Sequence, residues 1–342
     1  MYRPVRERSA DNIVAAVRRG IEQTGYEEVS LTSLSSTDHS QIREILTRLN
    51  AEFADSGVRV SIPSQRLDSF GVDMASLVAG RKKGGLTFAP EAGTQRLRDV
   101  INKNVTKDDL MAAARDAMEA GWRRMKLYFM IGLPTETDDD LVGIAEMANE
   151  AYETMKASTP ADQRGSLRLG ISVNVFVPKS QTPFQWDGQI SPDEAARRVS
   201  VIRQNLKYRA ITLSYHAPKT SLVEAVMSRG GREVADVVES AWRNGARFDA
   251  WTELFDEHAW AQAFEETGVD ARAIAETSYD SSRAMPWAHI SCGAEDGFLA
   301  HERELAYQGV TTEDCTFGDC TICGVCPSLH VKNVLQDVRG VR

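Results

Sequence analysis

Hydrophobic positions in the first part of the chain switch between helical and strand spacing. Apolar residues from Ile13 to Ile21 recur on one face of a helix, and Gly25 stands where that helix should end. The segment "SQIREILTRLNAEF" has the same amphipathic spacing. Between and after these segments, "EEVSLTSL", "VRVSIP" and "GGLTFAP" indicate strands, and a short helix is expected over residues 74–79.

The same alternation continues to Trp186. Thr106 with Asp109, and Thr137 with Asp140, have the spacing of helix N-terminal caps before two further helices. "RMKLYFMIG" is a nearly continuous apolar run, which predicts a strand covered on both faces. "LRLGISVNVFV" predicts one more strand.

Strands that are joined through helices lie parallel, because each crossover returns the chain to the same end of the sheet. The pattern fits either a barrel or an open doubly wound sheet, and in both the functional groups gather at the carboxyl ends of the strands. Those ends are expected at residues 34–38, 63–68, 90–96, 132–136 and 178–186.

The pattern changes after Trp186. Ser191, Pro192 and Glu194 predict a capped helix start with a capping box, and mostly helical segments follow, with one short strand in "AITLS". We therefore expect a βα domain over residues 1–186, a helical region over residues 187–310 and a cysteine-rich tail over residues 311–342.

Composition narrows the class of protein. The 342 residues have a formal charge of −9, which argues against a broad phosphate-binding surface, although short basic stretches keep RNA as a weaker expectation. No apolar run is long enough to span a bilayer, and the first residues lack the apolar core of a signal peptide. We expect a cytoplasmic protein that does not contact a membrane, where cysteines stay reduced.

Four of the five cysteines stand close together in "CTFGDCTICGVCP", at Cys315, Cys320, Cys323 and Cys326. Two-residue gaps let thiolates converge on one centre, so these four are expected to bind a metal ion or cluster. The run is closer to a bacterial ferredoxin than to a zinc knuckle, and an iron–sulfur cluster is favoured over zinc.

Two acidic residues follow predicted strands. Glu91 ends one strand in "FAPEAGTQRLRDVINKN", and Arg96 begins the helix after it; Glu136 follows the strand in "KLYFMIGLPTETDDDL". Glu91 could accept hydrogen bonds from an amino group, and Arg96 and Arg98 could meet a carboxylate. Glu136 could simply complement the dipole of the helix that it precedes.

These two segments, in this order, resemble the radical S-adenosylmethionine (SAM) superfamily. The likeness is closest to the cobalamin-binding members with a "CGVC" tail, which also have counterparts of "YRPVRERS", "SLTSLSSTDHS", "SIPSQRLDSF", "NVFVPKSQTPFQW" and "GARFDAW". It implies an α/β fold: a partial (βα) TIM-type barrel that lacks its first strand, followed by a mostly helical region and the short tail.

The resemblance also implies a set of SAM-binding residues at the strand ends. Serines of the second strand end would lie near the methionyl group, Glu91 and Arg96 near the ribose and carboxylate, Gly132 by the adenine, and Asn174 along the pocket. The complete set is Ser33, Ser35, Ser64, Arg66, Glu91, Arg96, Gly132 and Asn174.

One feature departs from the superfamily. Its SAM-reducing cluster is held by C-x3-C-x2-C after the first strand, whereas no cysteine precedes Cys292 here. We therefore expect the cobalamin domain, the first strand and the cluster loop to lie in a missing or separate N-terminal segment, so that this chain alone is inactive. The tail cysteines would fully ligate an auxiliary cluster, such as [4Fe–4S], or zinc, and would leave no open position for SAM.

The predicted function is thus a fragment of a radical SAM, cobalamin-dependent enzyme with no substrate that the sequence identifies. Two alternatives stay open. One is a cluster-independent βα-barrel enzyme with Asp68, Glu91 and Glu136 as acid–base groups. The other is a non-catalytic zinc-bearing module that binds RNA or protein.

Overall fold

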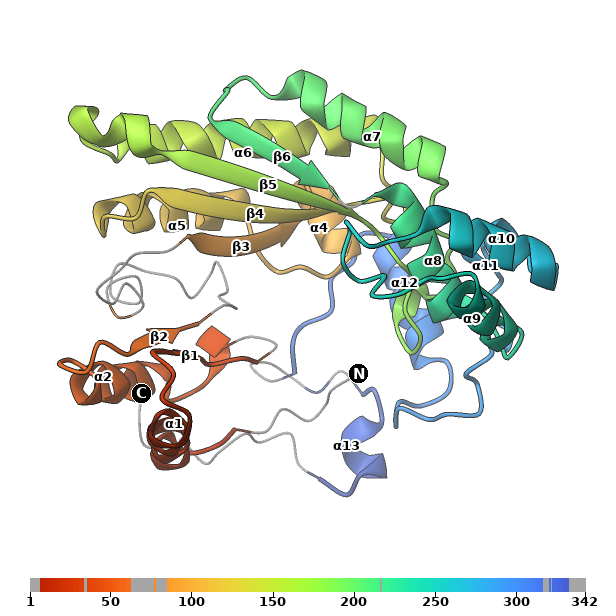
Figure 1. The fold of residues 1–342 in the computed structure, drawn as a ribbon, viewed down its shortest axis with the longest axis horizontal. Helices are drawn as coiled ribbons and strands as arrows, with labels where there is room; N and C mark the ends of the chain where they lie inside the picture. The colour runs from red at the N-terminus through yellow and green to blue at the C-terminus, as the bar shows by residue number, and fades with distance from the viewer. Residues whose placement is uncertain are drawn as a thin grey trace.

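A computed structural model describes residues 7–33, 36–62, 77, 85–215, 217–315, 320 and 322–331. Its strands form two parallel sheets (Figure 1). β1 (Glu28–Ser30) pairs with β2 (Arg59–Ser61), and β3 (Leu86–Glu91), β4 (Arg124–Ile131), β5 (Arg168–Val175) and β6 (Ile211–Tyr215) pair in chain order. Neighbours in space are therefore neighbours in sequence, as in a singly wound barrel and unlike a doubly wound sheet.

Helices cover one face of each sheet. α1 (Ala10–Thr24) and α2 (Ile42–Glu52), with the short η1 (Ser36–Asp38) between β1 and α2, pack on β1–β2. α5 (Lys107–Glu119), α6 (Asp138–Ala157) and α7 (Pro192–Asn205) pack on β3–β6 and form the main core with them. A short α4 (Gln95–Val100) follows β3, and η2 (Ala161–Ser166) precedes β5.

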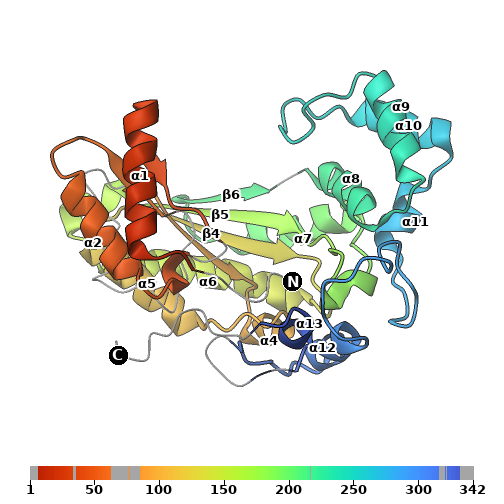
Figure 2. The same cartoon turned by 90° about the horizontal axis from the view of Figure 1, so that it is seen from below.

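The remaining helices lie beyond the arrowheads of the strands (Figure 1). These are η3 (Pro183–Trp186), α8 (Pro218–Arg229), α9 (Val234–Arg243), α10 (Glu257–Thr267), α11 (Ala271–Glu276), α12 (Phe298–Tyr307) and α13 (Val325–Ser328). α9 and α10 share a small core of their own around Trp260 and project away from the sheets (Figure 2). No helix in the described ranges is long and apolar enough to cross a membrane.

Most helix ends follow the sequence signals. Gly25 ends α1 in the left-handed conformation, and Thr106 forms a reciprocal capping box with Asp109. The capping box predicted at Ser191 is half wrong: Ser191 accepts from the backbone of Glu194 at 3.2 Å, but the Glu194 carboxylate pairs with Arg197 and Arg198 instead. The helix predicted over residues 74–79 lies outside the described residues except for residue 77.

Two further predictions need correction. β6 is the fourth strand of the larger sheet, so the sheet domain continues past the boundary expected at residue 186 to Tyr215. The strand is short and only Ile211 is buried, which is why it reads as an isolated element. β4 also does not have apolar residues along both faces, because Lys126 and Tyr128 alternate with its buried residues.

Candidate functional site: the inner face and rim of the sheet

The face of the larger sheet opposite the helices is polar. The buried residues of β4, Met125, Leu127, Phe129 and Ile131, point to the helical core, so the alternating side chains point the other way. The strand register aligns these into rows, which we call the inner face: Thr87, Lys126, Gly170 and Thr212; Tyr128, Ser172 and Ser214; Met130 and Asn174. A parallel sheet is normally covered by apolar residues on both faces, so this polar face is unusual and is a candidate surface for a polar ligand.

The smaller sheet has the same polarity. Val29 and Val60 pack on α1 and α2, whereas the opposite face has an ion pair between Arg59 and Glu28 at 2.8 Å and a hydrogen bond between Ser30 and Ser61 at 2.9 Å. Both sheets therefore have an apolar face under their helices and a polar face away from them.

A cavity of about 260 Å³ opens at the carboxyl end of this face. We call it the rim cavity. Met130 of the inner face lines it, together with Phe176 and Phe184 after β5, and α12 closes it with Ala306. Because Met130 is paired with Asn174 across β4 and β5, the rim cavity adjoins the last row of the inner face.

Asn174 has a polar atom that the protein leaves unpaired. Its Oδ1 is buried and accepts no hydrogen bond from any described residue. A buried acceptor without a partner costs about 1–3 kcal/mol, so this atom is suited to receive an N–H or O–H from a ligand or a water molecule. Among the predicted SAM-binding residues that the structure describes, Asn174 and no other has a buried side-chain oxygen or nitrogen without a hydrogen-bond partner.

Glu91 lies at the end of β3, where the register with β4 shifts after Phe88 and the backbone of Glu91 adopts a positive φ of 69°. Its carboxylate is 3.5 Å from the Lys103 ammonium, next to Asn102 in the wall of the rim cavity. Burial raises the pKa of Glu91, and the nearby Lys103 charge partly opposes this shift. The strained backbone and partly buried charge fit a binding position at the rim.

Arg96 is engaged by the protein itself. It donates to the side chain of Thr135 at 3.1 Å and to its carbonyl at 3.0 Å, and it pairs with the buried carboxylate of Asp140. Thr94 and Thr137 also donate to Asp140. Although burial opposes it, these hydrogen bonds lower the pKa of Asp140. Arg96 thus joins the β3–α4 loop to the β4–α6 loop, and its predicted contact with a SAM carboxylate stays a prediction.

Gly132 and Glu136 form a tight turn after β4. Gly132 has a φ of 81°, and its N–H donates to Glu136 Oε2 at 2.7 Å. The Glu136 side chain is fully buried and pairs with Arg198 of α7, so it does more than complement a helix dipole. Burial raises the pKa of Glu136 to about 7, against the lowering by Gly132 and Arg198. A Cβ at position 132 would lie 2.8 Å from Ile190, so that side of the glycine is filled by the chain.

The other predicted residues divide into described and undescribed positions. Ser33 is exposed, and its hydroxyl lies 3.2 Å from that of Ser36. Ser35, Ser64 and Arg66 lie outside the described residues. The sequence analysis did not predict the ion pair between Arg96 and Asp140. It also did not predict the inner face, although the alternation of Lys126, Tyr128 and Met130 within an apolar run is a signal for it.

The tail cysteines differ in exposure: Cys323 is buried, Cys315 and Cys326 are half-buried, and Cys320 is exposed. They form no disulfide. Within the described ranges, no three Cys, His, Asp or Glu side chains lie close enough together to hold a metal ion. Metal or cluster binding by these four cysteines therefore stays a prediction.

Residues 1–148 match the family model described as "Radical SAM superfamily". This part of the chain belongs to the radical SAM superfamily, and the resemblance seen in the sequence is confirmed at that level. The superfamily implies SAM and a [4Fe–4S] cluster as cofactors.

Among curated relatives, the chain is 28% identical over 240 residues to "Uncharacterized protein MJ0966" of Methanocaldococcus jannaschii. The match covers 70% of this chain and 49% of the relative, so the chain spans about half the length of the curated relative that it matches.

Two solved structures show remote similarity. The radical SAM methyltransferase TsrM from Kitasatospora setae, solved with cobalamin and a [4Fe–4S] cluster, matches at a TM-score of 0.38 and 14% identity, over 49% of this chain and 29% of TsrM. The archaeal Methanocaldococcus infernus Elp3, with an N-terminal deletion, matches at 0.40 and 11% identity, over 60% of this chain and 51% of Elp3.

Proposed function

We propose that this chain is the SAM-binding part of a radical SAM enzyme and that SAM lies along the inner face with its adenosyl group at the rim cavity. The observation that supports this most is the unpaired, buried Oδ1 of Asn174, whose register partner on β4, Met130, lines the rim cavity. Phe176 and Phe184 in the cavity wall offer aromatic surface for an adenine ring. Glu91, at the end of β3 and outside the cavity wall, would offer its carboxylate to the cationic part of the ligand. Asn174 would accept a hydrogen bond from the adenosyl or amino group.

The residues present do not fit the SAM-reducing cluster. The superfamily holds it with C-x3-C-x2-C, and the first cysteine of this chain is Cys292, far along the sequence from the sheet. We therefore derive no reductive step within this chain and propose that a segment outside these 342 residues supplies the cluster loop. The role left to this chain is to bind SAM, orient it and exclude water around it.

We further propose the cobalamin-dependent subclass. Its support is the sequence resemblance of the strand-end segments and the "CGVC" tail to cobalamin-binding members. The cobalamin itself would bind outside this chain. We propose the tail cysteines as ligands of an auxiliary cluster, which would brace the helical region against the sheet domain.

SAM binding by this chain is the direct test. Saturation-transfer NMR with SAM and with S-adenosylhomocysteine detects weak binding, which is expected because the cluster that chelates part of SAM is absent. Replacing Asn174 by Ala removes one hydrogen bond from a buried site, so affinity should fall about five- to tenfold. Asn12→Ala, at an exposed position of α1, is the matched control.

Two results would overturn the proposal. One is the absence of any SAM signal with the wild-type chain. The other is equal affinity for Asn174→Ala and Asn12→Ala, which would place the nucleoside away from the inner face.

A further inference from the structure

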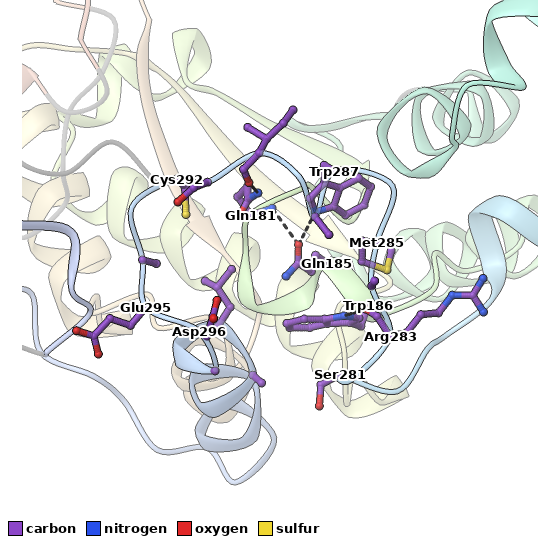
Figure 3. Close-up of a pocket in the computed structure, with 18 residues that line it drawn as sticks. Gln181, Gln185, Trp186, Ser281, Arg283, Met285, Trp287, Cys292, Glu295 and Asp296 are labelled. Carbon is purple, nitrogen blue, oxygen red and sulfur yellow. Dashed lines mark hydrogen bonds between the residues drawn. The ribbon is translucent and has the colours of Figure 1, made fainter. Parts of the chain in front are cut away.

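A second cavity lies beyond β5, between η3 and residues 281–300 (Figure 3). Its volume is about 270 Å³. We call it the tryptophan cavity, because Trp186 and Trp287 line it. The segment over residues 176–186 contributes to both cavities with different residues: Thr182, Pro183 and Phe184 line the rim cavity, whereas Gln181, Gln185 and Trp186 line the tryptophan cavity.

Gln185 is an oriented hydrogen-bond donor in this cavity. The residue is 6% exposed, and its Oε1 accepts from Trp287 Nε1 at 2.6 Å and from the Gln181 backbone at 3.1 Å. Both partners are N–H groups that can only donate, so the carbonyl oxygen of the amide must face them and the NH₂ group must face away. Figure 3 shows this nitrogen turned from Trp287 toward the side of Asp296. No described residue accepts a hydrogen bond from it.

The two tryptophans contribute ring surface. Trp186 Nε1 donates to the carbonyl of Arg283 at 3.1 Å, and Trp287 Nε1 donates to Gln185. Because both indole N–H groups are satisfied within the protein, a ligand meets only the apolar part of each ring. The buried side chain of Met285 adds to this apolar wall.

The wall opposite η3 is held in place by contacts on both sides. Gln181 Nε2 donates to the Ile290 carbonyl at 2.7 Å. The Glu295 N–H donates to the Cys323 carbonyl at 2.9 Å, and the Ser328 hydroxyl donates to the Gly293 carbonyl at 3.1 Å. The cavity is therefore preformed, and the cysteine-rich tail supports its outer wall.

We propose that the tryptophan cavity binds a neutral, planar heterocycle that bears a carbonyl group. The Gln185 NH₂ needs an acceptor, and the two indoles favour a flat ring. The charged residues of the wall are Glu295, Asp296 and Arg283, so acidic groups outnumber the single cation, which disfavours an anion and favours a ligand with N–H groups. The volume lies just below the usual range of small-molecule sites, which suits a ring of the size of nicotinamide or a cytosine nucleoside better than a large cofactor. This inference rests on the cavity alone and does not need SAM binding.

The test is an NMR titration of the wild-type chain with nicotinamide and with cytidine, following the indole N–H signals of Trp186 and Trp287. Both signals should shift on binding. Toluene, a ring without any hydrogen-bond acceptor, should bind at least tenfold more weakly.

Gln185→Glu isolates the donor. The glutamate keeps an acceptor for Trp287 and Gln181 but replaces the NH₂ group by an oxygen, so affinity for both probes should fall at least tenfold. Gln204→Glu, on the exposed surface of α7, should leave it unchanged. If Gln185→Glu fails to fold, the comparison of the carbonyl-bearing probes with toluene on the wild-type chain still tests whether the site requires an acceptor on the ligand. Absent shifts with the wild-type chain, or wild-type affinity in a folded Gln185→Glu, would overturn the proposal.

Discussion

At the scale of single residues, the rim has two carboxyl groups, Glu136 and Asp140, whose pKa values shift in opposite directions. Asp140 is held ionised by several donors, whereas burial of Glu136 favours its protonated form. Glu136 and Asp140 are close together in the sequence. The difference between their pKa shifts therefore arises from hydrogen bonding and burial and not from position along the chain.

Glu136 should make the stability of the protein depend on pH. Its pKa rises from an ordinary value of 4.5 to about 7 on folding, so the folded state holds this proton over a range in which the unfolded state has lost it. The stabilisation is complete below about pH 4.5 and is lost as pH rises to about 7, at about 1.4 kcal/mol per pKa unit, or about 3 kcal/mol in total. Urea unfolding of wild type and Glu136→Gln at several pH values measures it. The difference between them should change over this window; a constant difference would contradict the assignment.

Asp140 should be a main contributor to rim stability. Asp140→Ala leaves Thr94, Arg96 and the Thr137 backbone without their shared acceptor, which should lower the free energy of unfolding by about 2–3 kcal/mol. Asp139→Ala changes an exposed neighbour on the same helix and should shift it by less than about 0.5 kcal/mol. Equal effects in thermal unfolding would show that the hydrogen bonds around Asp140 are not formed.

At the scale of elements, the rim depends on the close approach of the β3–α4 loop and α6. A Cβ at Gly93 would lie 2.2 Å from the Ile144 nitrogen, while one at Gly143 would lie 3.0 Å from Thr94. Backbone atoms cannot move aside as a flexible side chain can, which explains why glycine stands at position 93.

This contact predicts a graded series of Gly→Ala variants. Gly93→Ala should destabilise the protein by about 1–3 kcal/mol because the loop and α6 must separate. Gly143→Ala should cost less, and Gly165→Ala, which has open space around it, should cost least. Chemical denaturation of the three variants gives the order; a Gly93→Ala protein as stable as Gly165→Ala would contradict the close packing.

The elements themselves were largely predictable, because apolar spacing and capping residues are local signals. Thr106 with Asp109, and Gly25 after α1, marked helix ends correctly. The inner face was not predicted, because a single lysine and tyrosine in "RMKLYFMI" are weak signals until the strand register aligns them with Ser172 and Thr212. Gln185 was missed for a similar reason: its orientation depends on Trp287, which is 102 residues away in sequence.

At the scale of the whole molecule, two cavities meet the same segment after β5. The rim cavity adjoins the inner face of the sheet, and the tryptophan cavity faces the region that the cysteine-rich tail supports. A SAM site and a second ligand site would then be separated by a single segment, residues 176–186, which would let this segment position both ligands.

A crystal structure of the chain with S-adenosylhomocysteine tests the central claim most directly. We predict density for the nucleoside at the rim cavity, with a hydrogen bond to Asn174 Oδ1. Nucleoside density confined to another place, such as the tryptophan cavity, would contradict it.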